Sequence, residues 1–150
     1  MPSISVIIST YNKPHFLEKV LTGYCFQTFN DFEIIIADDG SSNETKEMIT
    51  KFDQLLPQKI YHVWHEDNGF RKCKILNAAI LKSSNDYLVF SDGDCIPDSH
   101  FLEIHSRLAQ KDYFLSGGHF PITEKVSNLL TIEDIKSCLL YTSPSPRDDR

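Results

Sequence analysis

The chain has 150 residues and 41% of them are hydrophobic, which suits one globular domain with a core and excludes a disordered chain. Its formal net charge of −6 argues against a nucleic-acid partner, because a nucleic-acid groove needs clustered Lys and Arg to neutralise phosphates. A nucleotide ligand stays compatible with this charge, since a bound metal ion can meet its phosphates.

The start of the chain and its cysteines bear on location. No apolar run approaches the length that spans a bilayer, and the opening Met-Pro-Ser-Ile-Ser lacks the regions of a signal peptide. We therefore expect no transmembrane segment and a cytoplasmic location, with peripheral association at the inner membrane face left open. Without a signal peptide, the four widely spaced cysteines are expected to be free thiols.

Short apolar runs alternate with helical stretches along the chain. The runs lack strict alternation, which is typical of strands that are covered on both faces of a parallel sheet. The predicted strands are residues 4–8, 32–37, 60–64, 87–90 and, more weakly, 113–115. This order predicts an α/β fold with a doubly wound, mostly parallel, Rossmann-like sheet.

The helices between the runs carry start signals. Pro14 suits a first helical turn, with Asn12 before it as a candidate cap. Ser41 and Glu44 match a capping box, and Asp98 can cap a fourth helix. The apolar residues at helical spacing include Phe16, Leu17, Val20, Leu21 and Tyr24, then Met48, Ile49, Phe52 and Leu55, then Ile75, Leu76, Ala79 and Ile80, and finally Phe101, Leu102, Ile104 and Leu108.

Polar residues follow each of the first four predicted strands. These segments are Ser9 to Asn12, Asp38 to Ser41, His65 to Arg71, and Asp92 to Asp94. In an open α/β sheet, ligands bind outside the carboxyl ends of the strands. The four segments are therefore the candidate site. His62 and His65 are three apart in or near a strand, so we expect them to point to opposite faces and interpret them as ordinary histidines that form no zinc site.

Asp92-Gly93-Asp94 is the strongest candidate for chemistry. Two carboxylates at i and i+2 on an extended chain leave on the same side, and Gly93 allows a tight turn between them. Paired hard oxygens suit Mg²⁺ or Mn²⁺, with water and a substrate phosphate completing the coordination. An Asp-x-Asp sequence alone more often marks a surface turn, but here it directly follows a buried strand.

A second acidic segment, Asp38-Asp39-Gly40-Ser41, also follows a buried strand. Turn formation explains Gly40 and Ser41 but not two adjacent carboxylates, which repel each other unless one has a partner. One of them could accept the imide N–H of a uracil base. There is no Walker sequence and no G-x-G-x-x-G loop, so phosphates must be met by the metal and a few cations.

The candidate cations are Arg71, Lys72 and Lys74. Arg71 lies nearest to the end of a predicted strand, and we expect it to have a functional role. Lys72 and Lys74 are interpreted as the solvated face of a helix.

Three segments together resemble the family 2 glycosyltransferases of GT-A fold. They are Ser5 to Asn12, Glu33 to Ser41 and Tyr87 to Asp94, and they are similar to the family's opening strand, its Asp-Asp-Gly-Ser motif and its Asp-x-Asp motif. The stretch from His65 through Arg71 to Asn77 resembles the branch of chondroitin-polymerase-type and galactosyl- or hexosaminyltransferases. The resemblance extends over about residues 3–122.

This resemblance implies an inverting, metal-dependent transfer from a UDP-sugar to a hydroxyl of a glycan or lipid-linked saccharide acceptor. By match, Thr10, Tyr11 and Asp39 would hold the base with help from Arg71, and Gly93 would lie beside the nucleotide. Asp92 would hold the ribose or the metal, and Asp94 would ligate the Mn²⁺ or Mg²⁺ ion.

The resemblance leaves the catalytic base unassigned. Glu133-Asp134 lies too close to the Asp-x-Asp motif and lacks the aromatic and glycine setting of the family's base, so we interpret it as the polar face of a short helix. We expect residues 1–137 to be the donor-binding part of a GT-A domain whose base lies beyond the chain. Residues 138–150, rich in Pro, Ser and charge, read as a disordered or foreign tail.

Two alternatives stay open. The chain could be a non-catalytic or inactive truncated nucleotide-binding module. It could also be a sugar-nucleotide nucleotidyltransferase, although that class puts a glycine-rich basic loop after the first strand, where this chain has Ser9-Thr10-Tyr11-Asn12-Lys13-Pro14.

Overall fold

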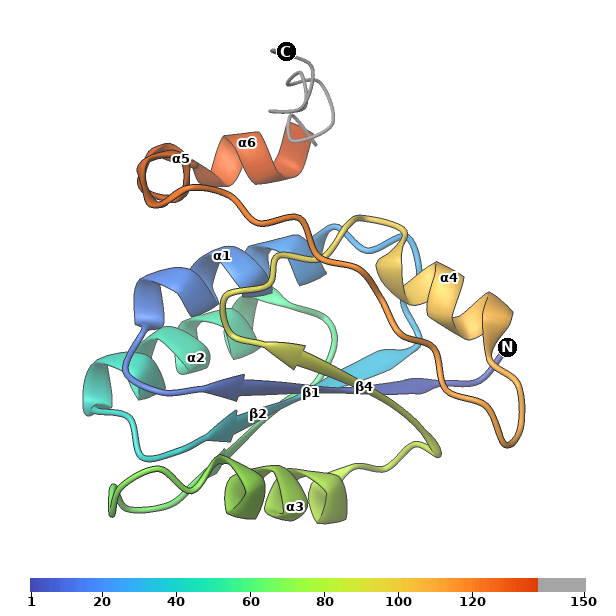
Figure 1. The fold of residues 1–150 in the computed structure, drawn as a ribbon, viewed down its shortest axis with the longest axis horizontal. Helices are drawn as coiled ribbons and strands as arrows, with labels where there is room; N and C mark the ends of the chain where they lie inside the picture. The colour runs from blue at the N-terminus through green and yellow to red at the C-terminus, as the bar shows by residue number, and fades with distance from the viewer. Residues whose placement is uncertain (138–150) are drawn as a thin grey trace.

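The computed structural model describes residues 1–137 as an alternation of strands and helices (Figure 1). The elements are β1 (Ile4–Thr10), α1 (Pro14–Cys25), β2 (Phe32–Asp38), α2 (Asn43–Leu55), β3 (Ile60–Trp64), α3 (Lys72–Lys82), β4 (Tyr87–Asp92), α4 (Phe101–Leu108), α5 (Glu124–Leu129) and α6 (Ile132–Ser137). The first four predicted strands and the four predicted helices are confirmed, with boundaries that move by a few residues.

The strands form one sheet in the order β3-β2-β1-β4, and every pairing in it is parallel. From β1 the chain moves outward to β2 and β3 and then returns to place β4 on the other side of β1. The direction of winding therefore reverses between β1 and β4, and the carboxyl ends of all four strands share one edge. This is the doubly wound arrangement that the sequence predicted, and it opens a crevice at the end of β1 and β4.

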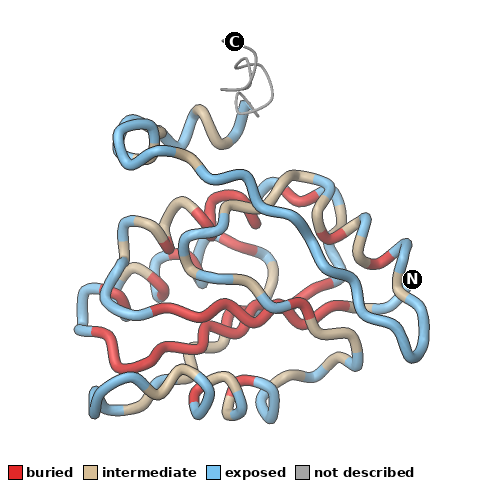
Figure 2. The backbone as a smooth tube through the Cα atoms, in the orientation of Figure 1, coloured by how far each residue is buried: buried red, intermediate tan, exposed pale blue. Residues whose placement is uncertain are grey.

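Helices cover both faces of the sheet, which explains the apolar character of its central strands. Val6 and Ile8 pack with residues of α1, α2 and α4 on one face, whereas Ile7 packs with Ile75 and Ala79 of α3 on the other. Figure 1 shows α1 and α2 on the face opposite to α3, and Figure 2 shows that β1 and β2 are buried along their length. Burial on both faces is why these strands show no alternation of polar and apolar residues.

The predicted fifth strand at residues 113–115 is wrong. Within residues 1–137 the sheet has four strands, and the chain leaves a turn at Asp112 to run on without regular structure. The exposed fraction is 70% for Tyr113 and 90% for Phe114. An apolar run predicts a strand only where a neighbouring strand and a packed face are available, and the described residues supply neither here.

The predicted caps Asn12 and Ser41 are wrong, because their side chains bind elsewhere, whereas Asp98 Oδ1 accepts the backbone N–H of His100 at 2.9 Å just before α4. Asn12 Oδ1 accepts the backbone N–H of Ser42 at 2.9 Å, and Ser41 Oγ accepts the backbone N–H of Asn12 at 2.9 Å. Helix α2 begins after Ser42, which makes no side-chain cap hydrogen bond, and α4 begins after His100 instead of Asp98. Asn12 and Ser41 thus tie the loop after β1 to the loop after β2.

The end of the described chain lies against α1. The predicted short helix around Glu133-Asp134 is confirmed as α6, which packs on α1, and Lys19 Nζ donates to the carbonyl oxygen of Ser127 at 2.5 Å.

Cys25, Cys73 and Cys95 are free thiols. The expectation for residues 138–150, including Cys138, lies outside the described residues. None of the helices in residues 1–137 is both long and apolar enough to cross a membrane.

Candidate nucleotide and metal site

A cleft of about 440 Å³ opens at the carboxyl end of the sheet, where β1 and β4 end side by side. Its size falls within the range of about 300–1,000 Å³ that is typical of small-molecule sites. It is lined by Ser9, Thr10, Tyr11, Lys13, Ala37, Asp39, Gly69, Phe70, Lys72, Asp92, Gly93 and Asp94. The topology therefore brings four segments that are far apart in sequence to one place.

The loop after β4 fits closely against the end of β1. The backbone N–H of Gly93 donates to the carbonyl oxygen of Ser9 at 2.8 Å, and a Cβ atom at Gly93 would lie 2.9 Å from that same oxygen. The chain then turns, since the N–H of Cys95 donates to the carbonyl oxygen of Asp92 at 3.1 Å. The predicted extended geometry is thus wrong in detail, but both Asp92 and Asp94 still line the cleft.

Asp92 is held by two donors on one oxygen. Ser9 Oγ and Lys72 Nζ each lie 2.6 Å from Asp92 Oδ1. The hydrogen bonds from Lys72 and then from Ser9 lower the pKa of the Asp92 carboxyl, so it stays ionised. Lys72 lies on the partly exposed start of α3 and also lines the cleft, and its interpretation as part of a solvated helix face missed the contact with Asp92. The ion pair is partly exposed, so its main consequence is charge placement and not stability.

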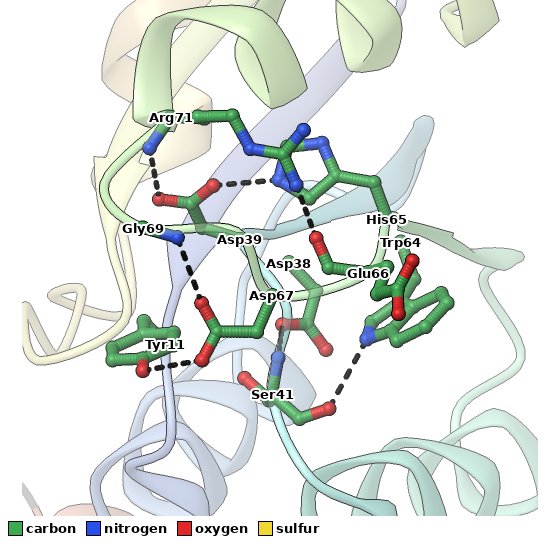
Figure 3. A network of polar contacts seen from close by, with 10 residues as sticks. All are labelled: Tyr11, Asp38, Asp39, Ser41, Trp64, His65, Glu66, Asp67, Gly69 and Arg71. Carbon is green, nitrogen blue, oxygen red and sulfur yellow. Dashed lines mark hydrogen bonds and ion pairs between the residues drawn. The ribbon is translucent and has the colours of Figure 1, made fainter.

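Asp39 has a hydrogen-bond partner on each carboxylate oxygen (Figure 3). His65 Nε2 lies 2.6 Å from Oδ1, and the backbone N–H of Arg71 donates to Oδ2 at 2.9 Å. Asp39 is buried, yet it reaches the wall of the cleft. The interpretation of His65 as an ordinary histidine therefore missed a direct contact with a site residue.

The adjacent carboxylates of Asp38 and Asp39 have different surroundings and different hydrogen-bond partners. Asp38 is fully buried, and it accepts the N–H of Ser41 at 2.8 Å on Oδ1 while His62 Nε2 lies 2.8 Å from Oδ2. Burial raises the pKa of the Asp38 carboxyl, but the hydrogen bonds from His62 and Ser41 outweigh this and lower it. Asp38 thus holds the turn after β2, whereas Asp39 faces the cleft.

The loop after β3 is hydrogen-bonded to the loops after β1 and β2, as Figure 3 shows. Trp64 Nε1 donates to the carbonyl oxygen of Ser41 at 3.1 Å, and Tyr11 Oη donates to Asp67 Oδ2 at 2.9 Å. The hydrogen bond to Asp67 and its negative charge raise the pKa of the Tyr11 hydroxyl. The same loop supplies Gly69 and Phe70 to the cleft wall.

Arg71 is placed differently from the other predicted site residues. Its guanidinium donates to the carbonyl oxygen of Glu66, and the residue touches Asp39 through its backbone N–H. The remaining predicted residues, namely Thr10, Tyr11, Asp39, Asp92, Gly93 and Asp94, all line the cleft. Arg71 does not line the cleft, so it would influence a bound base only indirectly, through its hydrogen bond to Asp39.

Gly40 offers a test of how tightly these loops are packed. It has φ +100°, and a Cβ atom there would lie 2.6 Å from the Cα atom of Asp67. We expect Gly40→Ala to lower the free energy of unfolding by about 1–3 kcal/mol, because it adds a backbone clash to an unfavourable φ. Urea unfolding of the variant measures this difference.

Two glycines serve as matched controls. Gly69 shares the positive φ of Gly40, but a Cβ atom there would meet nothing within 4 Å, and Gly117 has open space without a positive φ. Gly69→Ala should therefore cost less than Gly40→Ala, and Gly117→Ala should cost least. Equal stability of the Gly40 and Gly117 variants would show that the Gly40 and Asp67 backbones are not in contact.

Comparisons with solved structures give the fold of the site. TarS of S. aureus in complex with UDP-GlcNAc superposes with a TM-score of 0.60 at 24% identity, covering 70% of this chain and 30% of that one. The mannosyltransferase PcManGT of Pyrobaculum calidifontis in complex with GDP-Man and Mn²⁺ gives a TM-score of 0.59 at 22% identity over 65% of this chain and 29% of its own. The four-stranded sheet therefore has the GT-A arrangement of these structural neighbours.

Sequence comparisons go further. The chain is 31% identical to chondroitin synthase of Escherichia coli over 110 residues, and 32% identical to glycosyltransferase AglE of Haloferax volcanii over 105 residues. These matches cover 73% and 69% of this chain, but only 16% and 34% of the length of the two relatives. The model of the family described as glycosyl transferase family 2 matches residues 5–135. The chain therefore belongs to glycosyl transferase family 2.

Proposed function

We propose that this chain binds the donor of an inverting glycosyltransferase that moves a sugar from a UDP-sugar to a hydroxyl of a glycan or lipid-linked saccharide acceptor. The observation that carries the proposal is that one cleft is lined by Asp39 after β2 and by Asp92 and Asp94 at the end of β4, on the two sides of β1. A hydrogen-bond acceptor for a base and a pair of carboxylates for a metal are the two features that a nucleoside diphosphate requires.

The base would lie near Asp39. An ionised carboxylate only accepts hydrogen bonds, so it selects a ligand group that donates, such as the imide N–H of uracil. Tyr11 and Phe70 line the same cleft and keep 49% and 86% of their surface exposed, which leaves aromatic faces for stacking on a base. Thr10 lies between this region and β4, where the ribose would follow.

The residues present fit a divalent cation that is shared with the diphosphate. Among residues 1–137 no group of three or more His, Cys, Asp or Glu side chains could hold a metal alone. Mg²⁺ and Mn²⁺ accept one or two carboxylates and take their other ligands from water and substrate phosphate, so Asp92 and Asp94 suffice. The bound ion would stabilise the negative charge of the leaving diphosphate as a Lewis acid.

Two lysines add positive charge at the same place. Lys13 and Lys72 both line the cleft, and Lys72 already contacts Asp92. The diphosphate would offer Lys72 a second anionic partner beside that carboxylate. Because Lys72 starts α3 directly after the loop over Asp39, the base region and the diphosphate region are connected by one short segment.

The acceptor side is not assigned within this cleft. Inverting transfer needs a carboxylate that takes the acceptor's proton from the opposite face of the sugar. The carboxylates that line the cleft in the described residues are Asp39, Asp92 and Asp94, and all three serve donor binding in this proposal. Glu133 and Asp134 lie on α6, where Asp134 accepts a hydrogen bond from Thr131.

Asp39→Ala tests the proposed base contact. We expect the variant to bind UDP about 5–150-fold more weakly, because an unpaired buried polar group costs about 1–3 kcal/mol. Calorimetric titration of UDP measures the change, and GDP titrated into the same proteins tests the choice of base. Glu47→Ala, an exposed charge loss on α2, is the control. Unchanged UDP affinity in Asp39→Ala, or tighter binding of GDP than UDP by the unaltered chain, would contradict the proposal.

A further inference from the structure

His65 is a contact of the cleft that donor binding as described above does not use. Its imidazole projects from the loop after β3 onto the Asp39 carboxylate, opposite to the backbone N–H of Arg71 (Figure 3). Both side chains are largely buried, with exposed side-chain fractions of 18% for His65 and 8% for Asp39. Partly buried hydrogen bonds of this kind hold a side chain in place more effectively than exposed ones.

The protonation of this pair follows from the chemistry of its atoms. An ionised carboxylate accepts and does not donate, so His65 Nε2 must carry the proton that lies between it and Asp39 Oδ1. The N–H of Arg71 occupies a site on the other oxygen. With one donor on each oxygen, the two hydrogen bonds fix the plane of the Asp39 carboxylate.

Each carboxylate oxygen can accept two hydrogen bonds, so acceptor capacity remains on Asp39 after His65 and Arg71 are satisfied. Asp39 also lines the cleft. We propose that His65 is a positioning residue that fixes the orientation of the Asp39 carboxylate and thereby aims its free acceptor at the imide N–H of the donor's uracil. The proposal rests on the proposed function, since it presupposes a UDP donor.

His62 provides the contrast that isolates this role. It makes the same type of contact with the adjacent carboxylate, since its Nε2 lies 2.8 Å from Asp38 Oδ2. Asp38 is fully buried and does not line the cleft. A change at His62 therefore removes an equivalent His–Asp hydrogen bond in the same part of the fold without touching the proposed base contact.

The experiment compares UDP with N3-methyl-UDP, which lacks the imide proton. Both nucleotides are titrated by calorimetry, with Mn²⁺ present, into the unaltered chain and into His65→Ala, His65→Gln, His62→Ala and Asp39→Ala. The readout is the ratio of the two dissociation constants in each protein, which a partly unfolded sample does not alter. Gln keeps a neutral N–H donor, so it should replace His65.

We expect methylation to weaken binding to the unaltered chain and to His62→Ala by about tenfold or more, as the loss of one buried hydrogen bond implies. The ratio should fall to within about threefold of unity in Asp39→Ala and His65→Ala, and His65→Gln should restore it. If His65→Ala keeps the full ratio while Asp39→Ala loses it, His65 does not position Asp39 and the proposed function stands. If methylation leaves the affinity of the unaltered chain unchanged, or if that chain does not bind UDP, both proposals are wrong.

Discussion

Replacing Asp94 with Ala is expected to abolish the increase in UDP affinity that Mn²⁺ or Mg²⁺ gives. Asp94 follows the turn at Gly93 and lines the cleft next to Asp92, so it is the carboxylate that is left for a metal when Asp92 is engaged with Ser9 and Lys72. Mutation of outer-shell partners of a metal commonly costs about 10–100-fold in metal affinity, and loss of a direct ligand should cost at least as much. Calorimetry of UDP with and without Mn²⁺ measures the enhancement.

The control for this prediction is Glu47→Ala, which removes one negative charge from the exposed side of α2. It should keep the full Mn²⁺ enhancement. Circular dichroism should show the same unfolding temperature for Asp94→Ala as for the unaltered chain, because no packed side chain is lost. An Asp94→Ala chain that still binds UDP more tightly with Mn²⁺ would remove Asp94 from the role of metal ligand.

The second large effect concerns turnover. We expect the 150-residue chain to bind UDP, yet to transfer no detectable sugar to any glycan acceptor and at most to hydrolyse a donor slowly. General-base catalysis is typically worth about 10²–10⁴-fold, and positioning of the acceptor is worth more again. The carboxylates that line the cleft in residues 1–137 are Asp39, Asp92 and Asp94, and we propose that all three bind the donor.

The measurement is a radiolabel transfer assay with UDP-sugars and glycan acceptors, in which free sugar and elongated acceptor are separated. Ala substitutions at Glu133 and Asp134 serve as the control for a base on α6. Robust elongation by the chain, lost in either of these variants, would contradict the assignment of α6 to a structural role. Elongation that survives in both would contradict the expected absence of transfer and would leave the structural role of α6 in place.

The fold was predictable because its strands carry a strong signal. β1 and β2 are buried along their whole length, and a strand that is covered on both faces reads as an unbroken apolar run. The run at Tyr113-Phe114-Leu115 looks similar in sequence but has no neighbouring strand in the described chain. A local pattern cannot report whether a partner strand exists.

The site was only partly predictable for a related reason. Asp39, Asp92 and Asp94 lie at or just beyond the carboxyl ends of strands, so the general rule for α/β sheets finds them. His65 lies 26 residues from Asp39, and their contact depends on the register of β2 and β3, in which Asp38 stands opposite Trp64. Once that register is known, His65 is the residue expected opposite Asp39, but the register itself depends on the packing of the whole sheet.

The helix caps show the same competition between local and distant partners. Asn12 and Ser41 are good capping residues by type, yet their side chains bind each other's loop. Lys72 likewise satisfies the usual description of a solvated helix residue but contacts a carboxylate 20 residues further along the chain. Polar side chains near a site often bind other residues of the site, and a prediction from the local sequence then gives them the wrong role.

A crystal structure of the chain with UDP and Mn²⁺ would show directly whether this cleft binds the nucleotide and the metal as proposed. We expect the uracil ring within hydrogen-bond distance of the Asp39 carboxylate and a manganese anomalous peak between the diphosphate and Asp94. His65 should remain hydrogen-bonded to Asp39 in the complex. A nucleotide bound outside the crevice between β1 and β4, or a manganese ion that contacts neither Asp92 nor Asp94, would contradict the proposal.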